Sequence, residues 1–240
     1  MLNIIILTAY PEMFPGNLSY SLMGKALKEK IYTINKINLH DFGIDNRKSI
    51  DDVPFGGGPG MILRPDVVEK ALLTIPNQQN LKSAKIYLTP SGTLLNQGKL
   101  GLFSKLDQII ILCGRFEGVD QRAIDVLGFE EISIGDYILA GGEIAAQVLL
   151  EGCIRLIPGV LGHPESLLEE SFSNDLLEYP HFTRPQVWED SLGNKHDVPE
   201  VLRSGHHENI RKWRLDKSVE KTKNIRPDLY GKKNKKQDLK

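Results

Sequence analysis

Cysteine is scarce in this sequence: Cys113 and Cys153 are the only two in 240 residues. Each lies inside an apolar run, so we expect two buried, reduced thiols rather than a disulfide framework. Cysteine and histidine also lack the spacing of a zinc site, since the adjacent His206 and His207 would point in different directions on a helix. The sequence therefore indicates no metal ligands.

Long apolar runs are absent as well. No segment reaches the roughly 20 apolar residues that a membrane-spanning helix needs. Residues 1–7 are apolar but lack the basic start and the cleavage site of a signal peptide, so we interpret them as a first strand. We expect a cytoplasmic protein that does not associate with a membrane.

Two glycine-rich segments fail the patterns of phosphate-binding loops. In residues 56–61 the third glycine of G-x-G-x-x-G is replaced by Met61. In residues 92–100 five residues separate the glycines, and Leu100 stands where a P-loop has serine or threonine. A nucleotide triphosphatase is therefore unsupported, and residues 56–60 taken alone predict an exposed turn.

The small net charge of −1 hides an asymmetry. Residues 211–240 contain twelve basic and four acidic residues, a net charge of +8, so residues 1–210 carry −9. A basic arm on an acidic body favours a polyanionic partner such as a phosphate backbone. A solvated tail explains the charge equally well, above all for residues 232–240.

Strand-like and helix-like segments alternate over the first 160 residues. Four runs rich in Ile, Leu and Val are typical of strands that are buried on both faces: 2–7, 84–89, 108–113 and 129–134. Alternation of this kind predicts an α/β fold with a mainly parallel sheet and flanking helices. In such sheets ligands bind beyond the carboxyl ends of the strands.

The helical segments are recognised by caps and by spacing. Ser19 is placed to cap a helix in which Met23, Leu27 and Ile31 share one face. A second helix follows the glycines at 141–142. We expect helices also at 198–204 and 208–223, the latter carrying the basic residues Arg211, Lys212 and Arg214 around Trp213.

Composition divides the chain into three parts. Residues 1–160 form the predicted α/β domain. Residues 161–174 combine glycine, proline and glutamate and predict a flexible linker. Residues 175–240 predict a small helical domain with a basic tail.

Two further glycine-rich loops directly follow predicted strands, at 113–120 and 133–143. Glycine lets the backbone approach a ligand without interference from a Cβ atom. Each loop alone is equally typical of a tight strand-to-helix connection. Together they favour a pocket that recognises a planar heterocycle through main-chain hydrogen bonds and apolar walls.

Six motifs occur in order along the chain: GGGPGM (56–61), LTPSG (88–92), CGRFEGVD (113–120), SIGDYILAGGE (133–143), IPGVLG (157–162) and YPHFTRP (179–185). In this order they resemble the bacterial tRNA (guanosine-37-N1)-methyltransferases of the knotted SPOUT class. The resemblance extends from residues 11–14 to residues 211–214, which is nearly the whole chain.

The resemblance implies a trefoil-knotted α/β domain that binds S-adenosylmethionine, a homodimer with active sites at the subunit interface, and a C-terminal domain that grips the anticodon arm of tRNA. A role for Mg²⁺ is left open. Pro59 and Gly60 would border the substrate guanine, and Arg211, Lys212 and Arg214 would contact tRNA. The implied cofactor residues are Pro90, Gly114, Glu117, Ile134, Gly135, Asp136, Tyr137, Ile138, Leu139, Gly141 and Gly142.

The resemblance also implies the catalytic residues. Glu170 stands where the family often has an aspartate base, with Glu169 as an adjacent competitor, and Arg155 matches the catalytic arginine. Arg155 is expected beside its own chain's cofactor, where it meets Glu170 of the partner subunit. Phe116 replaces a common tyrosine. The alternatives are an exposed linker carboxylate for Glu170 and a helix-end cation for Arg155.

Two other functions stay open at this point. One is a catalytically inactive RNA-binding protein of the same fold. The other is a related enzyme that modifies a different RNA, because a fold does not determine a substrate.

Overall fold

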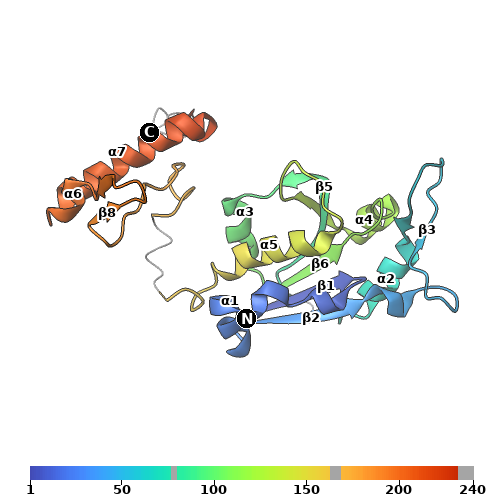
Figure 1. The fold of residues 1–240 in the computed structure, drawn as a ribbon. Helices are drawn as coiled ribbons and strands as arrows, with labels where there is room; N and C mark the ends of the chain where they lie inside the picture. Colours follow the sequence, from blue (N-terminus) through green and yellow to red (C-terminus); the bar gives the residue numbers. More distant parts are fainter. Residues whose placement is uncertain (77–79, 163–168, 232–240) are drawn as a thin grey trace. The chain divides into compact units, whose positions relative to one another are not determined.

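The computed structural model describes residues 1–76, 80–162 and 169–231 and divides the chain into two compact units, Met1–Gly162 and His163–Lys240 (Figure 1). The boundary falls within the predicted linker 161–174. Residues 163–168 of this linker lie outside the described residues. The lysine-rich end, 232–240, lies outside them too.

Unit 1 is built on a five-stranded, fully parallel sheet with the order β2-β1-β6-β5-β7. Its strands are β1 (Leu2–Thr8), β2 (Tyr32–Asn38), β5 (Ser83–Leu94), β6 (Gln108–Cys113) and β7 (Glu130–Ser133). The helices between them are α1 (Ser21–Lys28), α2 (Pro65–Leu73), α3 (Gln97–Phe103), α4 (Gln121–Leu127) and α5 (Gly142–Ile154). The predicted α/β class and the mainly parallel sheet are confirmed, whereas the trefoil knot stays a prediction.

Two apolar cores lie on opposite faces of this sheet, because successive side chains of a strand point to opposite faces. In β1, Ile4 and Ile6 join one core with residues of α1, α3 and α5, while Ile5 and Leu7 join the other with residues of α2 and α4. Figure 1 shows α5 running along one face of the sheet. Both cysteines are free and buried among these residues, as predicted.

The predicted strands are all present; β6 keeps its predicted bounds, and the other three have shifted ends. Strand β5 continues past residue 89 because its register against β7 breaks between Leu88 and Thr93, which both pair with Ile132. The prediction that Ser19 caps α1 is wrong. Ser19 is the last residue of a short 3₁₀ helix, η2 (Gly16–Ser19), and the N-cap residue of α1 is Tyr20, which has an extended backbone.

A small antiparallel ribbon carries the first glycine-rich loop. Strands β3 (Asp51–Asp52) and β4 (Ile62–Leu63) pair with each other, and residues 53–61 connect them. Ile50 and Leu63 are buried in the core beneath α2, so the ribbon is anchored at its base. The loop itself stays exposed, as the sequence predicts.

Unit 2 contains the predicted helices, here α6 (Glu200–Arg203) and α7 (His207–Ile225). It also holds a hairpin that the helical prediction omits, formed by β8 (Val187–Glu189) and β9 (Lys195–Asp197). Asp190 closes its turn by accepting backbone hydrogen bonds from Leu192 and Asn194. Both strands are exposed throughout, so they need no alternation of apolar and polar residues, and the sequence lacks the pattern from which a strand is predicted.

Candidate functional site

A cavity of about 250 Å³ opens at the carboxyl ends of β6 and β7, beside the middle of β5. Its lining consists mainly of residues 87–90 within β5 and of the two connections that follow β6 and β7. All the predicted cofactor residues except Asp136 lie in its wall, so the fold brings together residues from 90 to 142. Its apolar walls include Leu88, Ile132 and Ala145.

Glycines set how closely the connections approach one another. A Cβ atom on Gly142 would lie 2.9 Å from Cα of Cys113, and one on Gly114 would lie 2.8 Å from the ring of Tyr87. In this tight junction the amide of Gly142 donates a hydrogen bond to the carbonyl of Gly114, at 2.9 Å. The two loops predicted to share a ligand are therefore joined directly at the start of α5.

A buried ion pair fixes the same junction. The carboxylate of Glu143, whose side chain is 1% exposed, lies 2.9 Å from Nε of Arg115 and accepts a 2.8 Å hydrogen bond from Thr8. Nε of Arg115 and Oε2 of Glu143 are not aligned for a hydrogen bond, so the attraction is electrostatic. The Arg115 guanidinium also covers the ring of Tyr10 at 4.3 Å. Residues that follow β1 and β6 are thus tied to α5.

Burial changes the chemistry of the thiol behind this wall. It raises the pKa of Cys113 well above its usual value, and the negative charge of Glu143 adds to the effect. Cys113 therefore stays a neutral thiol and serves as packing rather than as a nucleophile.

The glycine loop 53–61 meets the cavity at its second end. The amide of Glu117 donates to the carbonyl of Met61 at 2.9 Å, and the amide of Leu63 donates to the carbonyl of Gly118 at 2.9 Å. A Cβ atom on Gly60 would lie 2.3 Å from Cγ of Glu117. Gly60 thus touches a cavity residue, while Pro59 and Gly60 themselves lie outside the cavity wall.

Arg155 does not line the cavity of its own chain. Gly142 opens α5 at the cavity, and Arg155 caps the other end of this 13-residue helix. With a rise of 1.5 Å per residue the two positions are about 20 Å apart, beyond the reach of an arginine side chain. Arg155 is thus outside the wall of this cavity, and its expected place beside its own chain's cofactor stays a prediction.

The two glutamates proposed as base differ in their surroundings within unit 2. Glu169 accepts a 2.8 Å hydrogen bond from the hydroxyl of Tyr179 and pairs with Arg214 at 3.5 Å. Arg214 in turn covers the ring of Tyr179 at 4.7 Å. Glu170 follows in a turn, where its backbone carbonyl accepts a hydrogen bond from the amide of Ser173. Glu169 is thus engaged in a cluster of its own unit.

The basic residues of α7 separate into two kinds. Arg211 and Lys212 are exposed, whereas Arg214 is half-buried in the cluster with Tyr179 and Glu169. Trp213 contacts Phe182 with ring centroids 6.2 Å apart, so the predicted aromatic anchor packs inside unit 2. The helix offers Arg211 and Lys212 to solvent.

Sequence reasoning missed two residues that shape the cavity. Tyr87 lines it from β5, and Arg115 lines it while pairing with Glu143. Arg115 stands inside the motif CGRFEGVD, but its partner is 28 positions away in sequence, a pairing that only the fold reveals. Among residues 1–76, 80–162 and 169–231, no group of three or more His, Cys, Asp and Glu residues is arranged to hold a metal ion.

The helices in the described part of the chain are short or polar by the standard of a membrane span. None of its helices combines the length and the apolar character that a bilayer span requires.

Comparison with known proteins agrees with these features. Residues 2–232 match the family described as tRNA (Guanine-1)-methyltransferase TrmD. The tRNA (guanine-N(1)-)-methyltransferase of Wolbachia pipientis subsp. Culex pipiens is 49% identical over 95% of this chain and 96% of its own. The enzyme of the same name from Rhodospirillum rubrum is 48% identical over 95% of this chain and 92% of its own. The enzyme of that name from Wolbachia pipientis wMel is 50% identical over 95% of this chain and 94% of its own. The chain belongs to the tRNA (guanine-1)-methyltransferase family.

Proposed function

We propose that this protein transfers the methyl group of S-adenosylmethionine to N1 of the guanosine at position 37 of tRNA, on the 3′ side of the anticodon. The observation that carries the proposal is the cavity beside β5 and at the ends of β6 and β7, lined by glycine motifs in a chain of the tRNA (guanine-1)-methyltransferase family.

The residues of the cavity fit this methyl donor. Apolar walls such as Leu88 and Ile132 suit a planar purine, and the exposed backbone of the glycine loops offers donors and acceptors to its edge. Glu117 adds a carboxylate at the rim, a suitable acceptor for ribose hydroxyls. The bound donor supplies an electrophilic methyl group on a sulfonium, which leaves as a neutral thioether.

The nucleophile has to be prepared by the protein. N1 of guanine carries a proton at neutral pH, and a carboxylate must accept that proton as the N1–methyl bond forms. We assign this role to Glu170, because it stands at the position where the family resemblance expects the carboxylate base. Arg155 stabilises the negative charge that develops toward O6 of the base.

The position of Arg155 supports a homodimer with shared active sites. Ile144 and Val148 are 49% and 50% exposed on α5, and Arg155 follows them at helical spacing, so all three share one face. A second copy that covers these apolar residues brings each Arg155 to the other subunit. In this arrangement Arg155 serves the cavity of its partner, about 20 Å away from its own.

Exposed Arg211 and Lys212 on α7 suit the phosphates of the anticodon arm. A loop nucleotide also costs less to extrude than a paired one. The protein then works in the cytoplasm, where its tRNA substrate is found.

Mapping the product tests the proposal directly. Unmodified tRNA is incubated with the protein and methyl-labelled S-adenosylmethionine, and the modified nucleotide is located by digestion and mass spectrometry. We expect label on N1 of guanosine 37 and none on a transcript with adenosine there. Label at another nucleotide assigns a different substrate. Binding of tRNA and of the methyl donor without transfer identifies an inactive RNA-binding protein.

A further inference from the structure

The glycine loop 53–61 has almost no support of its own. Phe55 is fully exposed, and a Cβ atom on Gly56, Gly57 or Gly58 would meet no atom within 4 Å. These three glycines have positive φ angles of 80–119°, a region open mainly to glycine. The path of the loop is therefore determined by its two ends.

The second end is fixed by backbone hydrogen bonds to the cavity loop, from Glu117 to Met61 and from Leu63 to Gly118. The first end, at Asp52, belongs to a ribbon with only two residues in each strand. A ribbon of this size is marginal in water without further contacts. Buried Ile50, which accepts a backbone hydrogen bond from Arg64, anchors the base of the ribbon, so the chain beyond it depends on side-chain contacts at Asp52.

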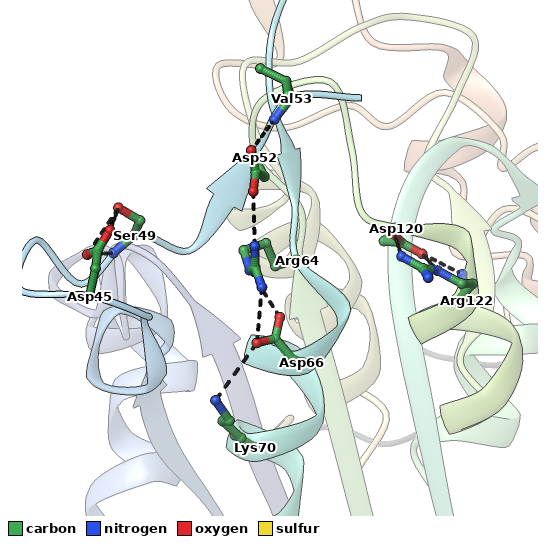
Figure 2. Close-up of polar contacts among 9 residues, drawn as sticks. All are labelled: Asp45, Ser49, Asp52, Val53, Arg64, Asp66, Lys70, Asp120 and Arg122. Carbon is green, nitrogen blue, oxygen red and sulfur yellow. Dashed lines mark hydrogen bonds and ion pairs between the residues drawn. The ribbon is translucent and has the colours of Figure 1, made fainter. Parts of the chain in front are cut away.

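Arg64 provides these contacts (Figure 2). Its Nη1 donates to Oδ2 of Asp52 at 3.0 Å, while Nε and Nη2 donate to the two oxygens of Asp66 at 3.1 and 3.4 Å. One planar guanidinium thus links the start of the loop to the first turn of α2. Its side chain is 27% exposed, so solvent screens it less than a free surface pair.

Asp52 transmits this link into the loop. Its Oδ1 accepts a 2.8 Å hydrogen bond from the amide of Val53 while Oδ2 holds Arg64. The carboxylate therefore fixes the direction in which the chain leaves β3. On the other side, Asp66 is held by the helix and by Lys70 at 3.8 Å.

We propose that Arg64 is a positioning residue for guanine recognition, bridging Asp52 and Asp66 so that Pro59 and Gly60 are held at the mouth of the cavity. The assignment of guanine to this loop rests on the proposed function. The bridge requires the fork of an arginine, because an ammonium is a point charge and cannot align with two carboxylates in this way.

The test compares Arg64→Met with Arg64→Lys and Asp52→Asn in the full-length protein. Two control residues, Lys70 and Arg122, are also drawn in Figure 2. Lys70→Met removes only the distant contact to Asp66, and Arg122→Met removes a similar arginine fork, to Asp120, that stays within the first turn of α4. Each variant is measured by hydrogen exchange of residues 52–61, affinity for S-adenosylmethionine, melting temperature and steady-state methylation of tRNA.

We expect faster exchange confined to residues 52–61 in Arg64→Met and Asp52→Asn, unchanged affinity for the methyl donor, and about a tenfold lower kcat/KM for tRNA, since small misplacements are costly to reaction geometry. Arg64→Lys should keep most of the defect, and both controls should resemble the wild type. Unchanged exchange in Arg64→Met, or full rescue by lysine, overturns the proposal. The proposal is also overturned if hydrogen exchange rises throughout unit 1 and the melting temperature falls, because Arg64 then has a general structural role.

The two proposals fail separately in this experiment. If the wild type does not methylate guanosine, the guanine assignment falls with the proposed function, while hydrogen exchange still decides whether Arg64 braces the loop.

Discussion

At the scale of single residues, the assignment of the base depends on two adjacent carboxylates. Glu169 contacts Tyr179 and Arg214, so removing it disturbs the packing of unit 2. Glu170 is the position at which the family resemblance expects the base. We therefore expect substitution of Glu169 to lower the stability of unit 2 and substitution of Glu170 to lower the rate of methyl transfer.

Glu170→Ala should lower kcat at least a hundredfold, within the range by which general bases accelerate reactions, and leave the affinity for S-adenosylmethionine unchanged. Glu170→Asp should keep measurable activity, because the carboxylate is retained. Steady-state kinetics and calorimetric titration of the methyl donor measure both. Glu169→Ala is the matched control and should keep kcat while lowering the stability of unit 2. The reverse pattern would move the base to Glu169.

Residue types near the cavity were predictable, but their pairings were not. The glycines at 114, 135, 141 and 142 signal close approach of backbones, and they do line one cavity. The ion pair of Arg115 with Glu143 gave no such signal, since charged residues are usually solvated and rarely buried. Its recognition needs the three-dimensional path of the chain.

At the scale of elements, buried strands were predicted best because their composition is distinctive. All six residues of β6 are buried, and its predicted and observed bounds agree. The hairpin β8–β9 is exposed throughout, so no apolar alternation marked it. The break in β5 likewise depends on pairing with β7, a non-local property.

The hairpin depends on Asp190 and should respond to acid. Hydrogen bonds from His196 and Asn194 lower the pKa of Asp190 from 3.8 to about 2. A lowered carboxyl pKa stabilises the folded hairpin above pH 3.8, and this contribution is lost as the pH falls through about 2. Amide chemical shifts of residues 190–196 should therefore titrate with a midpoint near pH 2. Asp190→Asn should abolish this step, whereas a wild-type midpoint near 3.8 would contradict the hydrogen-bonded arrangement.

Helix α7 leads to a prediction about salt dependence. Replacing exposed Arg211 and Lys212 by glutamine should weaken tRNA binding and reduce the slope of log affinity against log salt by about two, roughly one for each lost phosphate contact. Lys25 and Lys28, both exposed on α1, provide the matched control pair, whose replacement should leave the slope unchanged. Filter binding across a salt series measures this. Equal slopes for the wild type and the α7 variant would mean that this face does not contact RNA.

At the scale of the whole molecule, local sequence patterns do not show which subunit of the proposed dimer supplies a residue; only the family resemblance placed Arg155 beside its own chain's cofactor. Local patterns report propensity and burial, and these are the same whether a helix end faces its own cavity or that of a partner. The length of α5 supplies the missing constraint, since Arg155 and the cavity lie at its opposite ends. The apolar face of Ile144 and Val148 supplies a surface on which a second copy can pack.

Mixed dimers test this arrangement with inactive proteins. Leu139→Arg fills the cavity with a bulky cation, at a side chain that is 40% exposed and therefore tolerant of change. Combined with Arg155→Ala and allowed to exchange subunits, it yields mixed dimers in which one site carries both defects and the other carries neither. Random pairing of equal amounts should restore about a quarter of the wild-type activity.

The choice of partners in the mixture decides where each residue acts. If Glu170 and Arg155 both come from the subunit opposite the cavity, Leu139→Arg with Glu170→Ala should also recover activity. Arg155→Ala with Glu170→Ala should stay inactive, because each site of that mixed dimer then carries one defect. Recovery in this last mixture, with none in the mixture of Leu139→Arg and Arg155→Ala, would place Arg155 in the site of its own chain. That outcome would contradict the proposal that Arg155 serves the cavity of its partner, which rests on the separation of about 20 Å along α5.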